Sequence, residues 1–324
     1  MQKIRIGIVG YGNLGRGVEF AIGNNPDMEL VAVFSRRSLP GTISGVPVLS
    51  IKDAAAYKEK IDVMLLCGGS ATDLIEQGPL IASLFNTVDS FDTHAKINDY
   101  FASMNKIAEI SGTVATISVG WDPGLFSLNR LLASSVLPNG TNHTFWGKGV
   151  SQGHSDAIRR IAGVKNAKQY TVPKEQVIAS LRAGEGLDVS SNTAHTRECY
   201  VVAKPGADLD AITKEIKTMP HYFEGYETHV TFISEEELQA EHAGYPHGGF
   251  VFRTGSTSPN TNHVMEFALK LDSNPEFTSS VLVAYARATF RLAKNGSTGA
   301  FTVFDIPFGL LSPKSGEALR ATLL

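Results

Sequence analysis

Two carboxylates stand where a parallel sheet would present reactive groups. Asp92 lies at the polar end of the predicted strand segment 87–94, and Asp122 follows the apolar strand 114–119. If both strands belong to one parallel sheet, both side chains face the crevice outside the carboxyl ends of its strands. One carboxylate there can hold an ammonium group, and the other can deprotonate an amine or activate water. Asp122, which precedes Pro123, is equally typical of a turn, so both interpretations stay open.

The glycine spacing near the N-terminus predicts a dinucleotide-binding loop. The β-branched run 3–9 is typical of a buried parallel strand and leads into Gly10, Gly12 and Gly15, the pattern G-x-G-x-x-G. These glycines allow a tight turn, close approach of a pyrophosphate and close helix packing. The helix that follows ends at 23–26 and offers free N–H groups to phosphates at its start. A glycine turn without a ligand is the alternative, since the motif alone is weak.

The end of the next predicted strand, 28–34, indicates which dinucleotide binds. NAD sites place Asp or Glu about 20 residues past the glycines to bind the ribose hydroxyls. This chain instead has Ser35, Arg36 and Arg37 there, and two guanidinium groups match a 2′-phosphate in charge and geometry. The pattern favours NADP(H), with a solvated basic turn as the alternative.

Other polar residues give weaker signals. Residues 67–70 end the buried strand 61–67 and are predicted to lie along the cofactor; Cys67 is disfavoured as a nucleophile because no basic partner is near it in sequence. Arg197 precedes a strand and suits a carboxylate clamp, although a surface ion pair is the simpler interpretation. Ligand contact and packing are both open for the only two tryptophans, Trp121 and Trp146.

The histidines predict neither a metal site nor a catalytic triad. No H-E-x-x-H motif or cysteine pair accompanies His242, His247 and His263, so no metal is expected. The run His154-Ser155-Asp156 resembles a triad only on paper, because sequence neighbours cannot act as nucleophile, base and orienting group in turn.

Size and composition indicate an ordinary two-domain globular protein. The chain has 324 residues, of which 43% are hydrophobic and 19% charged, enough for a substantial core. A net charge of -3 and a pI of about 6.3 provide no basic field for nucleic acid or an anionic membrane. Two cysteines exclude a disulfide framework. Without a signal peptide or an apolar run of about 20 residues, we expect a cytoplasmic protein.

Alternating strands and helices up to about residue 120 predict the fold that positions these groups. We expect an α/β protein with an N-terminal Rossmann-type, doubly wound parallel sheet in 1–120. After a glycine-rich connection at 144–154, strands at 199–202 and 229–233 flank a helix over 208–217. This order predicts a second, α+β domain with an open mixed sheet. A helix is expected over 278–294, an apolar strand or tail over 301–307, and a short helix over 52–60.

Several unusual strings occur together along the chain. They include GYGNLGR, FSRR, VDSFDTH, GWDPGLFS, HTFWGKGVSQGHSDAIRR, HTREC, MPHYFEGYE, YPHGG and LKLDSNPEFT. Together they resemble the meso-2,6-diaminopimelate dehydrogenase family, and the resemblance runs almost from Met1 to Pro313. It implies NADP-dependent, reversible oxidative deamination at the D-centre of meso-diaminopimelate, giving L-2-amino-6-oxopimelate and ammonia, in lysine and cell-wall precursor metabolism.

The resemblance also assigns residues and an assembly. The cofactor contacts it implies are Gly10, Tyr11, Gly12, Asn13, Leu14, Ser35, Arg36, Arg37, Cys67, Gly68, Gly69, Ser70, Ser90, Phe91, Asp92, Val119, Gly120, Trp121, Asp122 and Pro123. The substrate contacts are Asp92, Asp122, Trp146, Thr171, Arg197, His247 and Asn274, with the backbone of Ser151, Gln152 and Gly153. Asp92 and Asp122 would meet the reacting ammonium group, and which of them is the base stays open. The family further implies a homodimer, a substrate-binding and dimerisation domain at 121–274, and a return of about 275–324 to the nucleotide domain.

Two other functions remain as alternatives. An NADPH-dependent reductase of a cyclic imine or an aldehyde, as in the dihydrodipicolinate reductase group, needs no second clamp for a distant amino-acid centre. A regulator that senses NADP(H) would bind the cofactor through the same glycine loop and turn nothing over.

Overall fold

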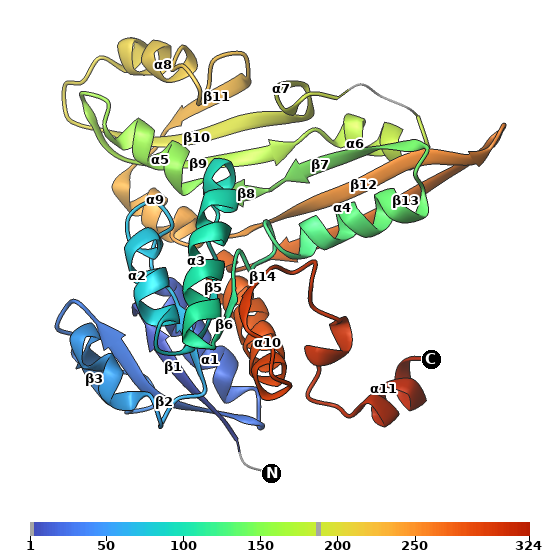
Figure 1. Ribbon diagram of the computed structural model, residues 1–324. Coiled ribbons are helices and arrows are strands. Elements are labelled where there is room, and N and C mark those ends of the chain that lie inside the picture. The colour runs from blue at the N-terminus through green and yellow to red at the C-terminus, as the bar shows by residue number, and fades with distance from the viewer. Residues whose placement is uncertain (1–2, 186–188) are drawn as a thin grey trace. The chain divides into compact units, whose positions relative to one another are not determined.

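The chain folds into two compact units. The computed structural model describes residues 3–185 and 189–324 (Figure 1). Unit 1 comprises Met1–Leu128 and Pro275–Leu324, and unit 2 comprises Asn129–Asn274. The first change of unit falls inside helix α4 (Leu125–Val136), later than the expected position after residue 120, because this helix continues from one unit into the other.

Unit 1 is built on a seven-stranded sheet in which every pairing is parallel. The strand order is β14-β6-β5-β4-β1-β2-β3, which confirms the predicted Rossmann-type sheet. In Figure 1 the red C-terminal strand lies beside β6, so the end of the chain completes a sheet made of blue to green strands. The strands are β1 (Ile4–Val9), β2 (Met28–Ser35), β3 (Val48–Ser50), β4 (Val63–Leu66), β5 (Asn86–Asp89), β6 (Val114–Thr116) and β14 (Gly299–Phe301).

Helices cover both faces of this sheet, as its apolar strands require. Alternate residues point to opposite faces, so Leu65 of β4 packs with α1 and α10 while Met64 packs with α2 and α3. The helices are α1 (Asn13–Gly23), α2 (Leu74–Ala82), α3 (Ile97–Ser111) and α10 (Asn274–Lys294), with α11 (Gly316–Leu323) near the C-terminus and the 3-10 helices η1 (Ile51–Tyr57), η2 (His94–Lys96) and η3 (Phe308–Leu310). The expected helix over 52–60 is thus a shorter 3-10 helix.

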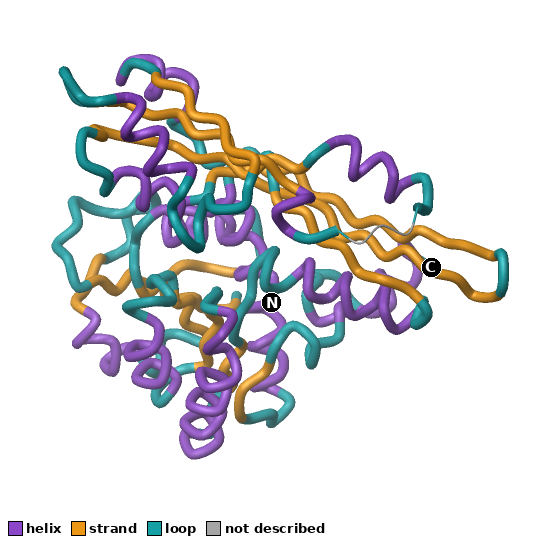
Figure 2. The backbone as a smooth tube through the Cα atoms, turned by 90° about the horizontal axis from the view of Figure 1, so that it is seen from above, coloured by secondary structure: helices purple, strands orange, loops and turns teal. Residues whose placement is uncertain are grey.

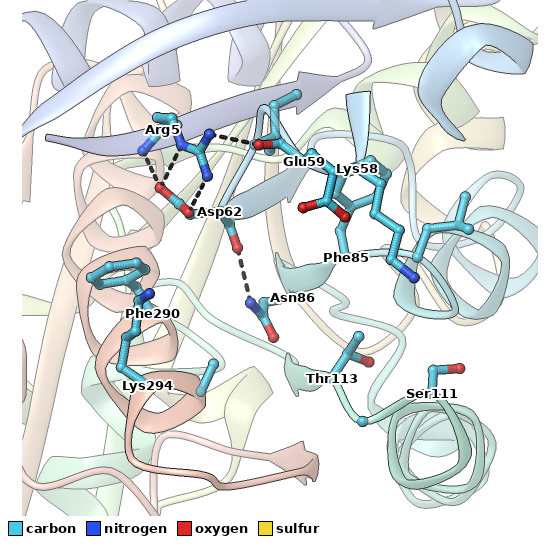
Figure 3. Close-up of a pocket in the computed structure, with 14 residues that line it drawn as sticks. Arg5, Lys58, Glu59, Asp62, Phe85, Asn86, Ser111, Thr113, Phe290 and Lys294 are labelled. Carbon is cyan, nitrogen blue, oxygen red and sulfur yellow. Dashed lines mark hydrogen bonds and ion pairs between the residues drawn. The ribbon is translucent and has the colours of Figure 1, made fainter. Parts of the chain in front are cut away.

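A cavity of about 380 Å³ lies at the amino-terminal ends of the strands of this sheet, and Arg5, one of the cationic residues that line it, is paired within the protein. Arg5 donates through Nε and Nη2 to the two carboxylate oxygens of Asp62 at 3.1 and 2.8 Å, and through Nη1 to the carbonyl of Glu59 at 2.7 Å. Figure 3 shows this pair together with the hydrogen bond from Asn86 to the Asp62 carbonyl. The guanidinium therefore braces the start of β1 against the start of β4.

Unit 2 contains two sheets. The first is mixed, in the order β11-β10-β9-β8, and the second is antiparallel, in the order β13-β12-β7, which confirms a second α+β domain with a mixed sheet. Figure 2 shows the long β12–β13 hairpin extending past the neighbouring strands. The strands are β7 (Gly140–Trp146), β8 (Gly149–Val150), β9 (Val164–Pro173), β10 (His195–Ala203), β11 (Glu227–Phe232), β12 (His247–Ser258) and β13 (Thr261–Leu271). The helices are α5 (Gln152–Arg159), α6 (Glu175–Arg182), α7 (Ser191–Ala194), α8 (Leu209–Lys217) and α9 (Glu235–His242).

The prediction of a glycine-rich connection at 144–154 was wrong. This segment contains the end of β7, all of β8 and the start of α5. Glycine serves close packing here: a Cβ on Gly147 would lie 2.0 Å from the carbonyl oxygen of Thr171, and one on Gly249 would lie 1.9 Å from that of Phe145. The β12–β13 hairpin was not predicted.

The expectation of an apolar strand or tail over 301–307 was also mostly wrong, because the chain turns after its first residue. Only Phe301 belongs to β14, and the chain then turns because the Asp305 carboxylate accepts hydrogen bonds from the backbone and hydroxyl of Thr302 at 2.8 and 2.7 Å. The apolar character of the segment comes from Val303 and Ile306, which are buried in the core of unit 1.

Candidate active site

The glycine loop follows β1 and leaves the start of α1 without a side-chain cap. Gly10 has a φ of +89°, a conformation that favours glycine. A Cβ on Gly15 would lie 2.2 Å from the Gly10 carbonyl oxygen, so this position needs glycine for helix and loop to touch. A Cβ on Gly12 would meet nothing within 4 Å. The loop is therefore closed on its inner side and open where a phosphate would approach the helix N-terminus.

A cavity of about 650 Å³ adjoins this loop and collects the predicted cofactor residues of three strand ends. Arg36 is 62% exposed and forms an ion pair with Asp73, and the backbone N–H of Arg37 donates to the Ser35 hydroxyl at 3.0 Å. Asp73 also accepts from the backbone of Gly69 at 3.1 Å. The residues that line the cavity include Gly10, Tyr11, Gly12, Ser35, Arg36, Arg37, Cys67, Gly68 and Gly69.

Tyr11 is fixed by a carboxylate that the sequence did not single out. Its hydroxyl donates to Glu19 of α1, which is 6% exposed and also accepts from the backbone N–H of Ser44 at 2.6 Å. Burial opposes the charge on Glu19, but hydrogen bonds from Ser44 and Tyr11 outweigh it and lower the pKa of the carboxyl group. This network ties the loop between β2 and β3 to the glycine loop.

Cys67 has the wrong electrostatics for a nucleophile. Burial raises the pKa of its thiol to about 12, so the group stays neutral near pH 7 and the reactive thiolate is not formed. Its place beside the glycine loop leaves it a role in shaping the cavity wall.

Asp89 ties together the two loops that carry Asp92 and Asp122. Its wholly buried carboxylate accepts from the backbone N–H groups of Phe91 and Ser118, both at 3.0 Å, and from the Tyr100 hydroxyl at 2.8 Å. Burial raises its pKa to about 6. Ser118 has a φ of +56°, which is uncommon for a residue other than glycine, and the Asp89 bond holds it there.

The two candidate catalytic carboxylates differ in their surroundings within unit 1. Asp92 is exposed, and its backbone N–H donates to the Ser70 hydroxyl at 3.0 Å, which joins two predicted cofactor segments. Asp122 is partly exposed and lies in a tight turn, where a Cβ on Gly124 would come within 1.8 Å of the Gly120 carbonyl oxygen. The neighbouring Trp121 packs edge-on against Phe126 at 5.2 Å, so its ring has a packing role.

In unit 2, three neighbouring strands align the predicted substrate residues in a row. Arg197 of β10 lies opposite Thr171 of β9, which lies opposite Gly149 of β8. Arg197 donates to the Thr171 hydroxyl. The ring of His247 covers Gly149, since a Cβ there would meet the ring at 2.5 Å. The row therefore presents a guanidinium, a hydroxyl and an imidazole on one face of the sheet.

The Arg197 guanidinium is buried and has no carboxylate partner in the described part of the chain. Its residue is 8% exposed, its Nε has no hydrogen-bond partner, and no Asp or Glu pairs with it in residues 3–185 and 189–324. Its carbon Cζ lies 4.1 Å from the ring centre of Tyr226. Burial lowers its pKa, but an arginine keeps its charge at any ordinary pH. A buried cation of this kind is suited to receive an anionic group of a ligand.

The start of α5 lies beside this row. The backbone N–H of Ser151 donates to the carbonyl of Gln169 at 3.0 Å, two residues before Thr171 on β9. The Ser151 hydroxyl lies 2.7 Å from Nδ1 of His154. Burial, and the nearby charge of Arg197, lower the pKa of His154 to about 4, so this ring is neutral near pH 7.

In the described residues, the side chains of 154–156 and two of the three histidines considered as metal ligands have other partners. The Ser155 hydroxyl donates to the carbonyl of Ser151, and Asp156 pairs with Arg159. His242 bonds the Tyr170 hydroxyl at 2.9 Å and His263 bonds that of Thr257 at 2.8 Å. In the described part of the chain, no three His, Cys, Asp or Glu side chains gather as metal ligands, and no helix is both long and apolar enough to span a membrane.

Comparison with known proteins identifies the family. The model of the diaminopimelic acid dehydrogenase C-terminal domain matches residues 120–273. A meso-diaminopimelate D-dehydrogenase of Ureibacillus thermosphaericus is 65% identical, and the alignment covers 100% of both chains. The chain belongs to the meso-diaminopimelate dehydrogenase family.

Solved structures of relatives support the same family assignment. The Corynebacterium glutamicum diaminopimelate dehydrogenase in complex with DAP is 48% identical, covers 100% of each chain and superposes with a TM-score of 0.92. An engineered D-amino acid dehydrogenase bound to NADP+ is 46% identical over 100% of each chain, with a TM-score of 0.86. The resemblance noted from the sequence strings is confirmed.

Within this family's fold, the predicted residues divide between the two units. Unit 1 carries the glycine loop, the basic turn and both catalytic candidates, Asp92 and Asp122. Unit 2 carries Trp146, the start of α5, Thr171, Arg197, His247 and Asn274. The backbone N–H of Asn274 donates to the carbonyl of Tyr245 at 3.0 Å, which holds Asn274 close in structure to the segment before His247.

Sequence reasoning missed the residues that support the predicted contacts. Asp89, Glu19 and Tyr226 were not singled out, because each acts on a partner that is recognisable only after folding. The one available signal was for Asp89: a charged residue that ends an apolar strand is either solvated or, as here, buried with partners.

Proposed function

We propose that the protein catalyses the reversible, NADP-dependent oxidative deamination of meso-2,6-diaminopimelate at its D-centre, giving L-2-amino-6-oxopimelate and ammonia. Curated relatives that are 65% and 61% identical are meso-diaminopimelate D-dehydrogenases, and a family structure binds DAP. The observation that carries the proposal is Arg197: a buried guanidinium that pairs with no carboxylate of the described residues suits a substrate with a second carboxylate far from the reacting carbon.

The residues of unit 1 suit NADP rather than NAD. The open side of Gly12 and the uncapped start of α1 offer backbone N–H groups to the pyrophosphate. Arg36 and Arg37, at the cavity beside this loop, would hold the 2′-phosphate. NADP+, when bound, accepts the hydride from the D-configured α-carbon.

The residues of unit 2 would hold the inert end of the substrate. Arg197 and Thr171 would bind the L-centre carboxylate by charge-assisted and neutral hydrogen bonds, with His247 and Asn274 beside them. Ser151, Gln152 and Gly153 would contribute backbone groups, and Trp146 a wall. A clamp on the L-centre allows only a D-configured carbon to occupy the reacting position.

The carboxylates would carry the proton transfers. Asp92 or Asp122 removes a proton from the reacting ammonium group, so that loss of hydride leaves an imine. A water molecule, deprotonated by one of these carboxylates, adds to the imine carbon. The carboxyl group so formed returns the proton to the nitrogen, and ammonia leaves as the hydroxyl loses its proton and the carbonyl forms. We further propose, as the family resemblance implies, that the protein is a cytoplasmic homodimer that associates through unit 2; light scattering after gel filtration tests the dimer.

The test follows nicotinamide reduction at about 340 nm with purified protein, NADP+ and meso-diaminopimelate. Parallel assays contain NAD+, the L,L-isomer or a simple D-amino acid. We expect an absorbance rise with NADP+ and the meso isomer and little or none in the other assays. No rise, with NADPH binding intact, would contradict the proposal and point to an imine reductase or a regulator that senses NADP(H).

A further inference from the structure

The Arg197 guanidinium packs on Tyr226, which is not one of the predicted cofactor or substrate contacts. Tyr226 precedes β11, and its backbone is held from two sides: its N–H donates to the Phe223 carbonyl at 3.0 Å, and its carbonyl accepts from the Thr228 hydroxyl at 3.3 Å. Its ring lies under the guanidinium, 4.1 Å from Cζ to the ring centre. The ring therefore faces Arg197 from a fixed piece of backbone.

A chain of hydrogen bonds continues from Tyr226 to the backbone of Trp146. The Tyr226 hydroxyl donates to the Ser191 hydroxyl at 3.1 Å, and the Ser191 carbonyl lies 2.9 Å from Nδ1 of His195. The other ring nitrogen of His195, Nε2, accepts from the backbone N–H of Trp146 at 3.0 Å. The rings of His195 and Trp146 also stack, with centres 5.8 Å apart.

The partners of His195 decide its protonation. A backbone N–H can only donate and a carbonyl oxygen can only accept, so Nε2 must be bare and Nδ1 must carry the proton. His195 is thus neutral and both its nitrogens are engaged. The chain links the two predicted substrate contacts, Arg197 and Trp146.

We propose that Tyr226 is a positioning residue that sets the preference of the enzyme for substrates with a second, distant carboxylate. This inference rests on the proposed function. The electron-rich face of the ring stabilises the buried guanidinium through a cation–π contact and keeps its orientation. Tyr226 supplies no formal negative charge, so Arg197 keeps its full charge for the ligand. An Asp or Glu in its place would neutralise Arg197 and compete with the ligand carboxylate.

The test compares two substrates that differ by one group. D-Lysine is meso-diaminopimelate without its L-centre carboxylate. In Tyr226→Leu we expect kcat/KM for meso-diaminopimelate to fall roughly 10-fold, the size of a partly desolvated cation–π contact. The kcat/KM for the much slower reaction with D-lysine, measured at high enzyme concentration, should stay within about 2-fold. Equal losses for the two substrates would overturn the proposal, because they would indicate a general structural defect.

A double variant tests whether the effect passes through Arg197. In an Arg197→Met background, Tyr226→Leu should have almost no further effect on meso-diaminopimelate. Independent, additive losses would contradict the proposal. Tyr226→Phe keeps the ring but loses the bond to Ser191, so we expect kcat/KM for meso-diaminopimelate to fall roughly 3-fold. This variant also decides the question if Tyr226→Leu does not fold. A Phe variant that loses no kcat/KM for meso-diaminopimelate, or loses as much for D-lysine, would refute the role of the hydrogen-bond chain from Tyr226.

The matched control is Tyr200→Leu. Tyr200 lies three residues after Arg197 on β10, on the opposite face of the sheet, where its ring stacks on His242 at 4.0 Å. Tyr200→Leu should leave the ratio of kcat/KM for meso-diaminopimelate to kcat/KM for D-lysine unchanged.

Calorimetric titration separates this inference from the proposed function. If the wild type turns over no meso-diaminopimelate, the proposed function fails, but its Kd for meso-diaminopimelate can still be compared with that of Tyr226→Leu. A Kd roughly 10-fold weaker in the variant would support the positioning role by itself, and an unchanged Kd would refute it.

Discussion

Arg287 of unit 1 and Arg197 of unit 2 are both almost completely buried, with 1% and 8% of their surfaces exposed. Arg287 donates through Nε and Nη2 to both carboxylate oxygens of Asp27, at 2.6 and 2.7 Å, and has further bonds to the side chain of Asn25 and the carbonyl of Leu311. Arg197 donates to the hydroxyl of Thr171 and lies over the ring of Tyr226, and its Nε has no hydrogen-bond partner.

The difference separates a structural cation from a binding cation. A buried charge costs several kcal/mol unless it is paired, so Arg287, with a carboxylate and carbonyls, stabilises unit 1 by joining α10 to the turn after α1 and to the C-terminal segment. Arg5 at the amino-terminal edge of the sheet follows the same pattern with Asp62 (Figure 3). Among residues 3–185 and 189–324, Arg197 has no such partner, and it would gain one from a ligand. Predictions that separate stability from binding test this distinction.

The largest effect should come from Arg287→Met. Removing the guanidinium leaves Asp27 without its partner, and the free energy of unfolding should fall by about 3 kcal/mol. This is the lower end for a broken buried pair, because the Asp27 side chain is 32% exposed. Chemical denaturation measures the loss. The matched control is Arg291→Met, one turn later on α10. Among the described residues its guanidinium donates only to backbone carbonyls, so the free energy of unfolding should fall less in this variant. An equal loss in the two variants would contradict the role of the Asp27 pair.

Arg197→Met should lower activity and leave stability intact, the reverse of Arg287→Met. We expect kcat/KM for meso-diaminopimelate to fall at least about 100-fold, since a hydrogen bond to a charged group contributes roughly 3 kcal/mol. The free energy of unfolding should stay the same or rise, because an unpaired buried charge is removed. Initial rates and denaturation curves on the same preparation measure both. Unchanged kinetics would refute the assignment of Arg197 to the substrate.

Exposed arginines at the cofactor cavity provide a third case. Replacing Arg36 and Arg37 together by Ala should raise the KM for NADP+ roughly 10- to 100-fold by removing charge-assisted bonds to the 2′-phosphate. The KM for NAD+ should change little, because NAD+ has no phosphate there. Stability should be nearly unaffected, since surface ion pairs contribute about 1 kcal/mol or less. Equal increases in KM for NADP+ and NAD+ would contradict the proposal that these two arginines bind the 2′-phosphate.

The smallest expected effect is a change with pH in the free energy of unfolding that the Asp27–Arg287 pair contributes. Bonding to Arg287 lowers the pKa of Asp27 below its usual value of 3.8. The stabilisation by this pair is therefore complete above the unfolded-state pKa and is lost as the pH falls through the folded-state pKa. The difference in unfolding free energy between wild type and Arg287→Met should thus hold from about pH 6 to about pH 4 and narrow between about pH 4 and about pH 3. A constant difference over that range would show that Asp27 is not the group involved.

Local patterns explain which parts could be predicted. The glycine loop, the basic turn after β2 and the strands of the parallel sheet depend on turn chemistry and apolar periodicity within about 30 residues. Asp92, Asp122 and Arg197 could be nominated because of their types and of the strand ends beside them. The β12–β13 hairpin could not, because its glycines are read as loop residues unless the backbone that approaches them is known.

By itself, the sequence determined the fold class, the family and the residue types that the chemistry requires. Only the tertiary structure decided which charges have partners. Asp27 and Arg287 are 260 positions apart, and Tyr226 reaches Arg197 from the position just before the neighbouring strand β11. Such pairings arise from strand register and the packing of distant segments, which local periodicity does not encode. They make one buried arginine a structural element and leave another open to a substrate carboxylate.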